Sequence, residues 1–425
     1  MSQEVELLLS CHCGAARQTV VLRSSDIDLC HCHACRHGTG LLCVSYASIQ
    51  APPSLAGLVS HHVGSSSAHA SLHRYFCDTC GCHVFRHEKR LPPAEGEGEG
   101  EDEGEEWGVA TGVIVGRADA DAAGSVTRTG DEEAEPLLRF VRHVNTASTK
   151  DGGLSPFISH VEGSELEVRE NGSAPSTGER EIDGDDGGVL EAHCHCDAIR
   201  FHITRPDASS RLPHSGFPDL TVPFATTPRE IAANPHDEKW WLRPPGRANP
   251  TPTPTRYLAG TCACRSCRLA SGFEVQTWAF VPRSNLFFHP PLPSAPPPLV
   301  DSPSPASQPI PLDFAALAQR GIPLKSYASS PGVRREFCAR CGATVFWHDR
   351  WRPDLVDVSV GLLDAGEGAR AEGWLQWWCG RVSFEEEVGN GRTGEVARVA
   401  KSLIRSLAEG LGRWEDGKVD GTVDG

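Results

Sequence analysis

The sequence C-A-C-R-S-C-R-L-A-S-G at residues 262–272 has an earlier counterpart, C-H-C-H-A-C-R-H-G-T-G, at residues 30–40. Both stretches follow the frame C-x-C-x-x-C-R-x-x-x-G. Three thiolates so close in sequence can converge on one metal ion only where the backbone turns tightly, and three soft ligands leave a tetrahedral Zn²⁺ one ligand short. Each frame therefore predicts a metal site with one open coordination position.

The same two cysteine motifs flank both frames. A C-x-C motif precedes each frame, and an F-C-x-x-C-G motif follows it. Seven cysteines thus recur in one order with the same local spacing, which predicts an internal duplication. Insertions lengthen the second copy only between the clusters, as expected when cluster geometry is fixed and loops are free. The flanking cysteines are Cys11, Cys13, Cys77 and Cys80 in the first copy and Cys194, Cys196, Cys338 and Cys341 in the second.

Seven cysteines divide into four plus three. The two flanking motifs, brought together from opposite ends of one copy, would make a closed tetrahedral Cys₄ site of the kind that contributes to folding. The frame would make the open site, from Cys30, Cys32 and Cys35 or from Cys262, Cys264 and Cys267. Iron–sulfur clusters usually need four cysteines, so zinc is the expected metal, with up to two ions in each copy.

A structural alternative remains, in which a histidine closes the three-cysteine site. The first copy offers His31, His33 and His37, but the second has Ala263, Arg265 and Leu269 at those places. A histidine fourth ligand is therefore not the common design. Three cysteines are set aside as non-ligands: Cys43 aligns with Val275, Cys82 aligns with Ala343, and Cys379 has no counterpart.

Length and composition restrict the class of protein. A chain of 425 residues is long enough for about two domains, each with its own core. Its 17 cysteines, without a recognisable secretion signal, suggest reduced thiols in an intracellular compartment, the cytoplasm first, with the nucleus left open. The net charge of -16 argues against nucleic acid as a partner, and no apolar run approaches the roughly 20 residues of a membrane span.

The remaining sequence predicts β-rich units and one helix. Strand-like runs lie at residues 18–22, 41–49, 109–115, 273–281 and 355–363. Val396, Val399, Leu403, Leu407, Leu411 and Trp414 have the spacing of an amphipathic helix, which we expect to pack on the second copy, with self-association as the alternative. The acidic run 95–106 and the proline-rich segments 213–254 and 289–311 suit solvated surface loops.

These patterns predict four segments: a zinc domain at residues 1–162, a flexible linker at 163–188, a second zinc domain at 189–388 and a helical extension at 389–425. The linker is inferred from its glycines and polar residues.

The cysteine motifs resemble those of the glutathione-dependent formaldehyde-activating enzyme (GFA) family, a domain also found in centromere protein V. The resemblance covers residues 5–158 and 189–387, so it suggests two tandem GFA domains. It implies a mainly β fold, a β-tent of antiparallel sheets clamped by the Cys₄ zinc, with the second zinc on the three-cysteine frame. One departure is Asp197, which stands where the first copy has Gly14; aspartate tolerates positive φ better than most residues.

Two functions follow as hypotheses. The first is a zinc-dependent carbon–sulfur lyase acting on adducts of a small carbonyl compound with glutathione or a similar thiol, with the six frame cysteines as catalytic groups. Arg36 and Arg268 would then pair with a substrate carboxylate, unless they form surface ion pairs. The second is a non-catalytic, zinc-stabilised protein-binding module, in which Trp374, Trp377 and Trp378 either form a contact surface or pack in the core. The sequence leaves the oligomeric state open.

Overall fold

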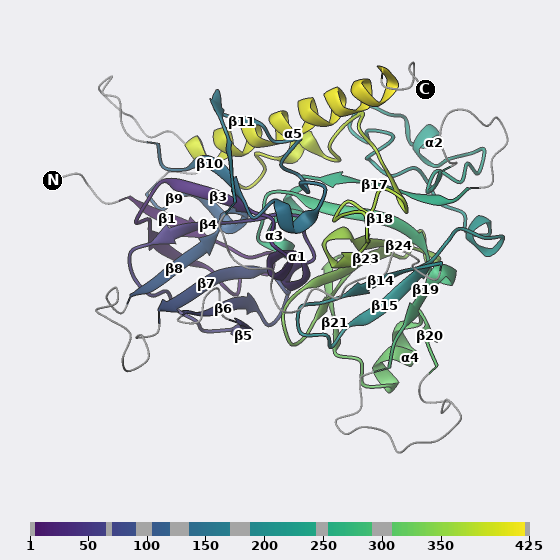
Figure 1. The fold of residues 1–425 in the computed structure, drawn as a ribbon, viewed down its shortest axis with the longest axis horizontal. Coiled ribbons are helices and arrows are strands. Elements are labelled where there is room, and N and C mark those ends of the chain that lie inside the picture. The colour runs from purple at the N-terminus through teal and green to yellow at the C-terminus, as the bar shows by residue number, and fades with distance from the viewer. Residues whose placement is uncertain are drawn as a thin grey trace.

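The computed structural model describes residues 5–64, 70–90, 104–119, 136–170, 188–243, 254–290 and 308–420. Most regular structure in them is β, as predicted, and no sheet mixes the two halves of the chain. We call the sheets of residues 5–170 the first unit and those of residues 188–388 the second unit. Figure 1 shows the two units side by side, in purple to blue and in teal to green.

The first unit contains a large sheet, a small sheet and a hairpin. Its large sheet has the strand order β13-β10-β3-β4-β8-β7-β6-β5, its small sheet has the order β2-β1-β9, and β11 pairs with β12. The elements are β1 (Glu6–Leu9), β2 (Gln18–Val21), β3 (Asp26–Cys30), α1 (His33–Thr39), β4 (Val44–Ile49), β5 (Leu58–Gly64), β6 (Ala70–Cys77), β7 (His83–Arg90), β8 (Glu105–Ala110), η1 (Thr111–Val113), β9 (Ile114–Arg117), β10 (Arg139–Val144), η2 (Ala147–Thr149), β11 (His160–Val161), β12 (Ser164–Glu165) and β13 (Glu167–Arg169).

The second unit repeats the division into a large and a small sheet. The large sheet has the order β16-β17-β18-β24-β23-β22-β21, with β26 also paired to β17, and the small sheet has the order β20-β19-β15-β14-β25. The elements are β14 (Val189–His193), β15 (Arg200–Thr204), η3 (Ser209–Arg211), α2 (Arg229–Ala232), β16 (Leu242–Arg243), β17 (Arg256–Cys262), α3 (Arg265–Ser271), β18 (Gln276–Pro282), η4 (Arg283–Asn285), β19 (Leu286–Phe288), β20 (Ile310–Pro311), α4 (Phe314–Gln319), β21 (Leu324–Ser330), β22 (Val333–Cys338), β23 (Thr344–Asp349), β24 (Leu355–Ser359), η6 (Val360–Leu362), β25 (Leu363–Asp364), β26 (Leu375–Trp377) and η7 (Glu385–Glu387).

The two large sheets share one strand path. The order β3-β4-β8-β7-β6-β5 in the first unit corresponds to β17-β18-β24-β23-β22-β21 in the second. In both units a later strand, β10 or β26, pairs in parallel with the strand that leads to the first frame cysteine. Short helices α1 and α3 occupy the same place, directly after that strand. The repeated order of the cysteine motifs is therefore matched by a repeated order of the strands.

The units contact each other through reciprocal backbone hydrogen bonds. The His12 amide donates to the Leu269 carbonyl at 3.0 Å, and the His195 amide, at the matching position, donates to the His37 carbonyl at 2.9 Å. A second pair joins the Gly112 amide to the Gly272 carbonyl and the Gly361 amide to the Gly40 carbonyl, at 2.9 and 3.0 Å. Equivalent residues thus exchange places across the interface, as in an isologous dimer, but within one chain.

Phe76 and Phe337, which precede equivalent cysteines, meet at the centre of this interface with their rings 6.5 Å apart in an edge-to-face arrangement. Each ring also covers a glycine of the other unit. A Cβ atom at Gly81 would lie 2.6 Å from the Phe337 ring, and one at Gly342 would lie 2.5 Å from the Phe76 ring. Only glycine leaves room for a phenylalanine ring so close to its backbone. Both glycines also have positive φ, 76° and 79°.

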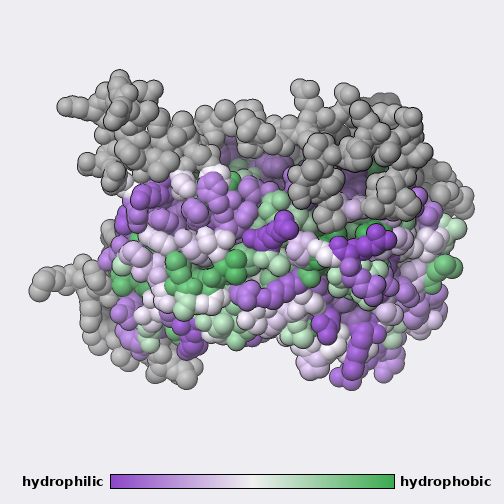
Figure 2. All heavy atoms as spheres, turned by 90° about the horizontal axis from the view of Figure 1, so that it is seen from below, coloured by the Kyte–Doolittle hydropathy of each residue, from purple (hydrophilic) through white to green (hydrophobic). Residues whose placement is uncertain are grey.

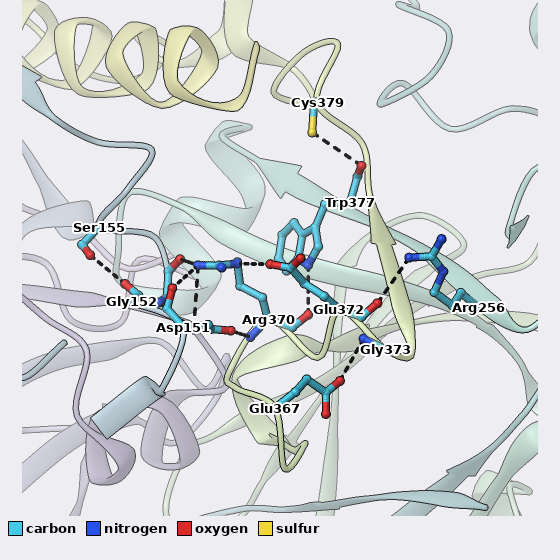
Figure 3. A network of polar contacts seen from close by, with 11 residues as sticks. Asp151, Gly152, Ser155, Arg256, Glu367, Arg370, Glu372, Gly373, Trp377 and Cys379 are labelled. Atoms are coloured by element: carbon cyan, nitrogen blue, oxygen red, sulfur yellow. Dashed lines mark hydrogen bonds and ion pairs between the residues drawn. The ribbon is translucent and has the colours of Figure 1, made fainter. Parts of the chain in front are cut away.

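Arg370 makes a further, asymmetric joint between the units (Figure 3). Its backbone amide and its guanidinium donate to Asp151 of the first unit, and Nη1 also donates to the Gly153 carbonyl at 2.8 Å. Within the second unit, Nε donates to Glu372 at 2.8 Å, and the Arg370 carbonyl accepts from the Trp377 indole at 2.9 Å. This buried arginine therefore holds the tryptophan-rich segment to the first unit.

The predicted amphipathic helix is present as α5 (Gly394–Asp420), which crosses the top of Figure 1. It packs against β9 and β11 of the first unit, so the prediction that it packs on the second unit is wrong. Ser402 and Ser406 accept hydrogen bonds from the backbone amides of Glu162 and His160, and Trp414 meets Phe157 edge to face. The hydrophobic stripe indicated a buried face but not which unit would cover it.

The predicted linker and loops are only partly covered by the structure. β12 and β13 lie inside the segment 163–188, so this segment begins with paired strands, and its residues 171–187 lie outside the described residues. Most of the acidic run, at residues 95–103, also lies outside them, as do residues 244–253 and 291–307 of the proline-rich segments.

The described part of the first proline-rich segment is not a simple surface loop. Trp240 and Trp241 are buried, and the Leu220 side chain occupies the space that a Cβ atom at Gly260 in β17 would need. Proline density correctly indicated the scarcity of regular structure, but the apolar side chains between the prolines pack on the large sheet. Trp374 and Trp377 are buried as well, which confirms core packing over an exposed contact surface.

The molecular surface in Figure 2 shows hydrophobic residues in separate groups among hydrophilic ones. Among the described residues, no helix has the length and apolar character needed to cross a membrane.

Candidate metal centres

The flanking cysteines of each unit come together as predicted. Cys11, Cys13, Cys77 and Cys80 form one group of four thiols that could hold a metal ion, and Cys194, Cys196, Cys338 and Cys341 form another. The measured sulfur–sulfur separations are 3.5 Å for Cys11–Cys13 and Cys13–Cys77, and 3.5 and 3.6 Å for the equivalent pairs of the second unit. Zinc–sulfur bonds of about 2.3 Å in a tetrahedron place sulfurs about 3.8 Å apart, so both groups fit zinc.

Tight turns present these thiols. The residue after each C-x-C motif has positive φ, 82° at Gly14 and 56° at Asp197, so the turn expected to survive the glycine-to-aspartate exchange is present. Cys194 Sγ accepts a hydrogen bond from the Ile199 amide, and Cys11 Sγ accepts one from the Ala16 amide, both at 3.4 Å. The backbone therefore orients equivalent sulfurs in the same way in both units.

The three-cysteine frames form two further groups, Cys30, Cys32 and Cys35 in the first unit and Cys262, Cys264 and Cys267 in the second. The first thiol ends a strand, the second caps a short helix and the third lies in its first turn. Cys32 Sγ accepts from the Cys35 amide at 3.4 Å, and Cys264 Sγ accepts from the Cys267 amide at 3.2 Å. Each helix ends at a glycine with positive φ, Gly40 or Gly272, so the last glycine of the frame closes the turn.

A buried arginine stands beside each frame. Arg74 donates to Cys35 Sγ at 3.1 Å, and Arg335 donates to Cys267 Sγ at 3.4 Å. Sequence analysis did not single out these arginines, although both precede the F-C-x-x-C-G cysteine by three residues. The neighbouring thiols Cys262 and Cys264, and then the Arg335 guanidinium, lower the pKa of Cys267, against the opposing effect of burial. The arginine thus favours the thiolate, the form that binds metal.

A cavity of about 560 Å³ opens onto the frame of the second unit. Cys262, Cys264 and Cys267 lie in its wall together with Arg335, and aromatic side chains line much of the remainder: Trp278, Phe280, Trp347 and Phe384. The proline-rich segment contributes residues 215–220 to the same wall. The insertion therefore builds part of a ligand-sized cavity, in the range of about 300–1,000 Å³ typical of small-molecule sites.

An acid group lies in this cavity as well. Asp357 on β24 is buried and pairs with Arg352, whose Nη2 lies 2.8 Å from one carboxylate oxygen. Burial raises the pKa of Asp357 to about 6, although Arg352 opposes the shift. Sequence analysis found no general base, because an aspartate in a strand has no local signature. Only the fold brings Asp357 to the cavity that contains the frame.

Residues 7–96 match the family model described as glutathione-dependent formaldehyde-activating enzyme, GFA. The first unit is therefore similar to the GFA family over these residues. The match lies in the first unit and includes the seven cysteines of its two groups that could hold a metal ion. No curated protein and no solved structure gives a match to the chain.

The two arginines that follow the frames, and the cysteines set aside as non-ligands, have structural roles. Arg36 and Arg268 are buried, so neither is a surface ion pair, and Arg268 donates to the backbone carbonyls of Gly112 and Asn390. Arg268 is thus a joint between the units and not a clamp for a substrate carboxylate. Burial raises the pKa of Cys43 to about 12, and Cys82 and Cys379 are also buried, which agrees with their assignment as non-ligands.

The three histidines of the first frame point to two different parts of the structure. His31 is buried and pairs with His143 through ring nitrogens 2.9 Å apart. His33 and His37 instead face the second unit, where they meet His193 and Asp364. The sequence alternative that a histidine closes the first frame therefore has no support in this geometry.

Proposed function

We propose that this protein is a zinc-dependent enzyme that makes or breaks a carbon–sulfur bond between a thiol and a small carbonyl compound. The observation that carries this proposal is the cavity of about 560 Å³ with three cysteine thiols in its wall. Zinc on these thiolates would supply a Lewis acid with one exchangeable position, able to hold a substrate sulfur or a carbonyl oxygen. The similarity of residues 7–96 to the GFA family supports glutathione or a related thiol as one substrate.

The repeated strand order and cysteine groups support a second GFA domain at residues 189–388, after the first at 1–162. We propose zinc at all four cysteine groups: the two Cys₄ groups as structural sites, and the two frames as chemically open sites. The protein would then hold up to four zinc ions on cysteine, with its thiols kept reduced in the cytoplasm. The open site of the second unit is the one with the described cavity.

The cavity wall also suggests which substrates fit. Trp278, Phe280 and Trp347 offer apolar surface, so at least one reactant carries a hydrophobic or aromatic group. Arg335 and Arg352 in the same wall offer positive charge to a carboxylate or to a developing oxyanion. The arrangement favours an adduct larger than that of a thiol with formaldehyde alone.

Asp357 has the properties of a proton carrier for this reaction. When a thiol adds to a carbonyl carbon, the sulfur–carbon bond forms and the carbonyl oxygen gains the proton that the thiol loses; the reverse reaction returns it. A carboxyl group with pKa about 6 can take and give a proton near neutral pH. No oxidant or reductant is needed.

The test is the rate of adduct formation and cleavage with thiols of increasing apolar size, measured on the zinc-loaded protein. Cys264→Ser should remove the activity of the second unit and, combined with Cys32→Ser in the first frame, should lower the rate by at least 100-fold. Cys43→Val, which copies Val275 of the second unit, is the matched control and should leave it unchanged. Equal rates for wild type, Cys264→Ser and buffer would overturn the enzyme and leave the alternative, a zinc-stabilised binding module, as the better description.

A further inference from the structure

A cluster of three histidines and one aspartate joins the two units away from the cysteine groups. His33 and His37 come from α1 of the first unit, His193 ends β14 and Asp364 ends β25 of the second. One ring nitrogen of each histidine and one carboxylate oxygen lie within 4.8 Å of one another. We call these four residues the inter-unit histidine cluster.

Hydrogen bonds fix the orientation of two rings. His37 Nδ1 lies 2.8 Å from the His193 carbonyl oxygen, and His193 Nδ1 lies 3.1 Å from the Cys194 carbonyl oxygen. Because a carbonyl oxygen can only accept, both Nδ1 atoms carry hydrogen. In each neutral ring the lone pair is then on Nε2. A ring N–H donated to a backbone carbonyl is the usual second-shell contact of a metal-binding histidine.

Both lone pairs point to the same carboxylate. His37 Nε2 lies 3.3 Å from Asp364 Oδ1, and His193 Nε2 lies 2.9 Å from Oδ2. The His37 Nε2 atom is buried and, apart from this 3.3 Å contact with Asp364, has no hydrogen-bond partner among the described residues. A nitrogen lone pair repels a carboxylate oxygen at these distances unless a cation, either a proton or a metal ion, lies between them. A tetrahedral ion with bonds of about 2.0–2.1 Å needs ligand atoms about 3.3 Å apart, close to these separations.

The rings are stacked, which favours a metal ion over protons as the cation. His33 and His37 have centroids 4.0 Å apart at 23°, and His37 and His193 have centroids 4.2 Å apart at 21°. Two or three imidazolium ions stacked at this distance in a partly buried place would repel strongly. Neutral imidazoles can stack and still present lone pairs to one ion. The side chains of His193 and Asp364 are 15% and 19% exposed, which leaves a path for the ion.

We propose that the inter-unit histidine cluster is a metal site for a divalent first-row transition-metal ion, zinc in first place, held by His33, His37, His193 and Asp364. Imidazole with one carboxylate suits such ions, and four protein ligands make a closed site. Because two ligands come from each unit, the ion would tie the units together. The proposal does not depend on the enzyme activity proposed above.

The duplication provides an internal comparison. At the matching positions of the opposite interface the chain has Arg265, Leu269, Ser10 and Val115, none of which is a ligand of this kind. Since the interface forms there without such a group, the fold itself does not require the four residues. The site is therefore expected once per chain, in addition to the cysteine sites.

Zinc per chain, measured after equilibrium dialysis against buffered free zinc, tests the proposal. His33→Gln and Asp364→Asn should each bind one ion fewer than wild type. Arg265→Gln, the change at the position that mirrors His33, should bind the wild-type number. Both test positions are partly exposed, and circular dichroism checks that each variant is folded. Equal zinc content in all four proteins would overturn the proposal.

Cobalt titration gives a second, spectroscopic measurement on the wild-type protein, with Asp364→Asn as the comparison. Cobalt on cysteine has intense sulfur-to-metal charge-transfer bands, whereas cobalt on three imidazoles and a carboxylate has ligand-field bands without them. One equivalent should therefore add only ligand-field absorption, and this contribution should be absent from Asp364→Asn. If every bound equivalent adds a sulfur band, the cluster holds no metal and the proposal fails.

Discussion

The two units share a strand path but differ around their frames, and the difference lies in side chains on matching strands. Tyr46 in β4 corresponds to Trp278 in β18, because each pairs with the last residue of the next strand. Arg86 pairs with Gly108 in the first unit, whereas Trp347 pairs with Asp357 in the second. The second unit therefore has two tryptophans and a carboxylate where the first has a tyrosine, an arginine and a glycine.

This comparison suggests a division of roles between the two units. Both units keep seven cysteines and the arginine that donates to the last frame thiol, so both keep the capacity to bind metal. The second unit adds a wall from its insertion and an acid with a raised pKa. The first unit adds two histidines that reach the interface. The units share the cysteine groups that could hold metal and the residues of the interface. They differ in the side chains around the frame, which would contact a ligand.

The largest expected effect is a loss of stability on mutation of a Cys₄ group, which both units have. Cys338→Ser removes one thiolate from a closed Cys₄ group, and metal-coupled folding energies of order 10 kcal/mol are comparable to the whole stability of a domain. We expect loss of cooperative unfolding, and because the units share a continuous buried core, both units should be affected. Cys77→Ser should behave alike. Thermal unfolding followed by circular dichroism measures this, with Cys82→Ala, which copies Ala343, as control. A stable first unit in Cys338→Ser would show that the units fold independently.

The reciprocal interface gives the next largest effect. Gly342→Ala and Gly81→Ala each place a methyl group on a phenylalanine ring at a positive φ, so each should cost about 3 kcal/mol of unfolding free energy. Urea unfolding measures both values. The costs should agree within about 1 kcal/mol if the interface is symmetric. Phe76→Ala should recover part of the loss in Gly342→Ala but none in Gly81→Ala; recovery in both would contradict the assignment of the contacts.

Features that depend on local spacing could be predicted from the sequence. The cysteine groups, the turn at Asp197 and the helix at residues 394–420 all follow from residues close together along the chain. The inter-unit histidine cluster did not, because its members come from segments far apart in sequence that only the interface unites. The docking of α5 was predicted on the wrong unit for a related reason: periodicity shows that one face is buried, but the covering surface is set by tertiary packing.

The frame arginines and the cavity illustrate two further limits. Arg74 and Arg335 were visible as a repeated position, yet an arginine in a strand indicates nothing about its partner until the fold places it beside a thiol. The insertion at residues 213–254, described in the structure except at residues 244–253, was predicted as surface loop from its prolines. Proline restricts backbone hydrogen bonding but does not prevent neighbouring Trp240 and Trp241 from entering the core.

Exchange of cavity residues between the units tests their divergence. Trp347→Arg gives the second unit the residue that the first has at this place and should weaken binding of an aromatic thiol by about 30-fold, or about 2 kcal/mol, through lost apolar contact. Calorimetric titration measures the affinity. The reverse change, Arg86→Trp, serves as control and should leave the affinity at the second unit unchanged. An unchanged affinity in Trp347→Arg would show that the ligand does not occupy the cavity.

The smallest expected effect is a pH dependence that only the second unit contributes. Burial raises the pKa of Asp357 from its usual range to about 6, so the folded protein binds this proton more tightly than the unfolded chain does. By linkage, the contribution of Asp357 to stability falls as pH rises from its unfolded pKa through about 6, and then stays constant. Relative to Asp357→Asn, wild-type stability should therefore fall by about 1 kcal/mol between pH 5 and pH 7.5. Urea unfolding of both proteins across this range measures the difference, and Asp354→Asn, at an exposed position, should run parallel to wild type. Because Gly108 occupies the matching place, no such titration comes from the first unit. A difference that rises with pH would mean that Arg352 dominates over burial and that Asp357 is a structural ion pair, which would remove it as the proton carrier of the proposed reaction.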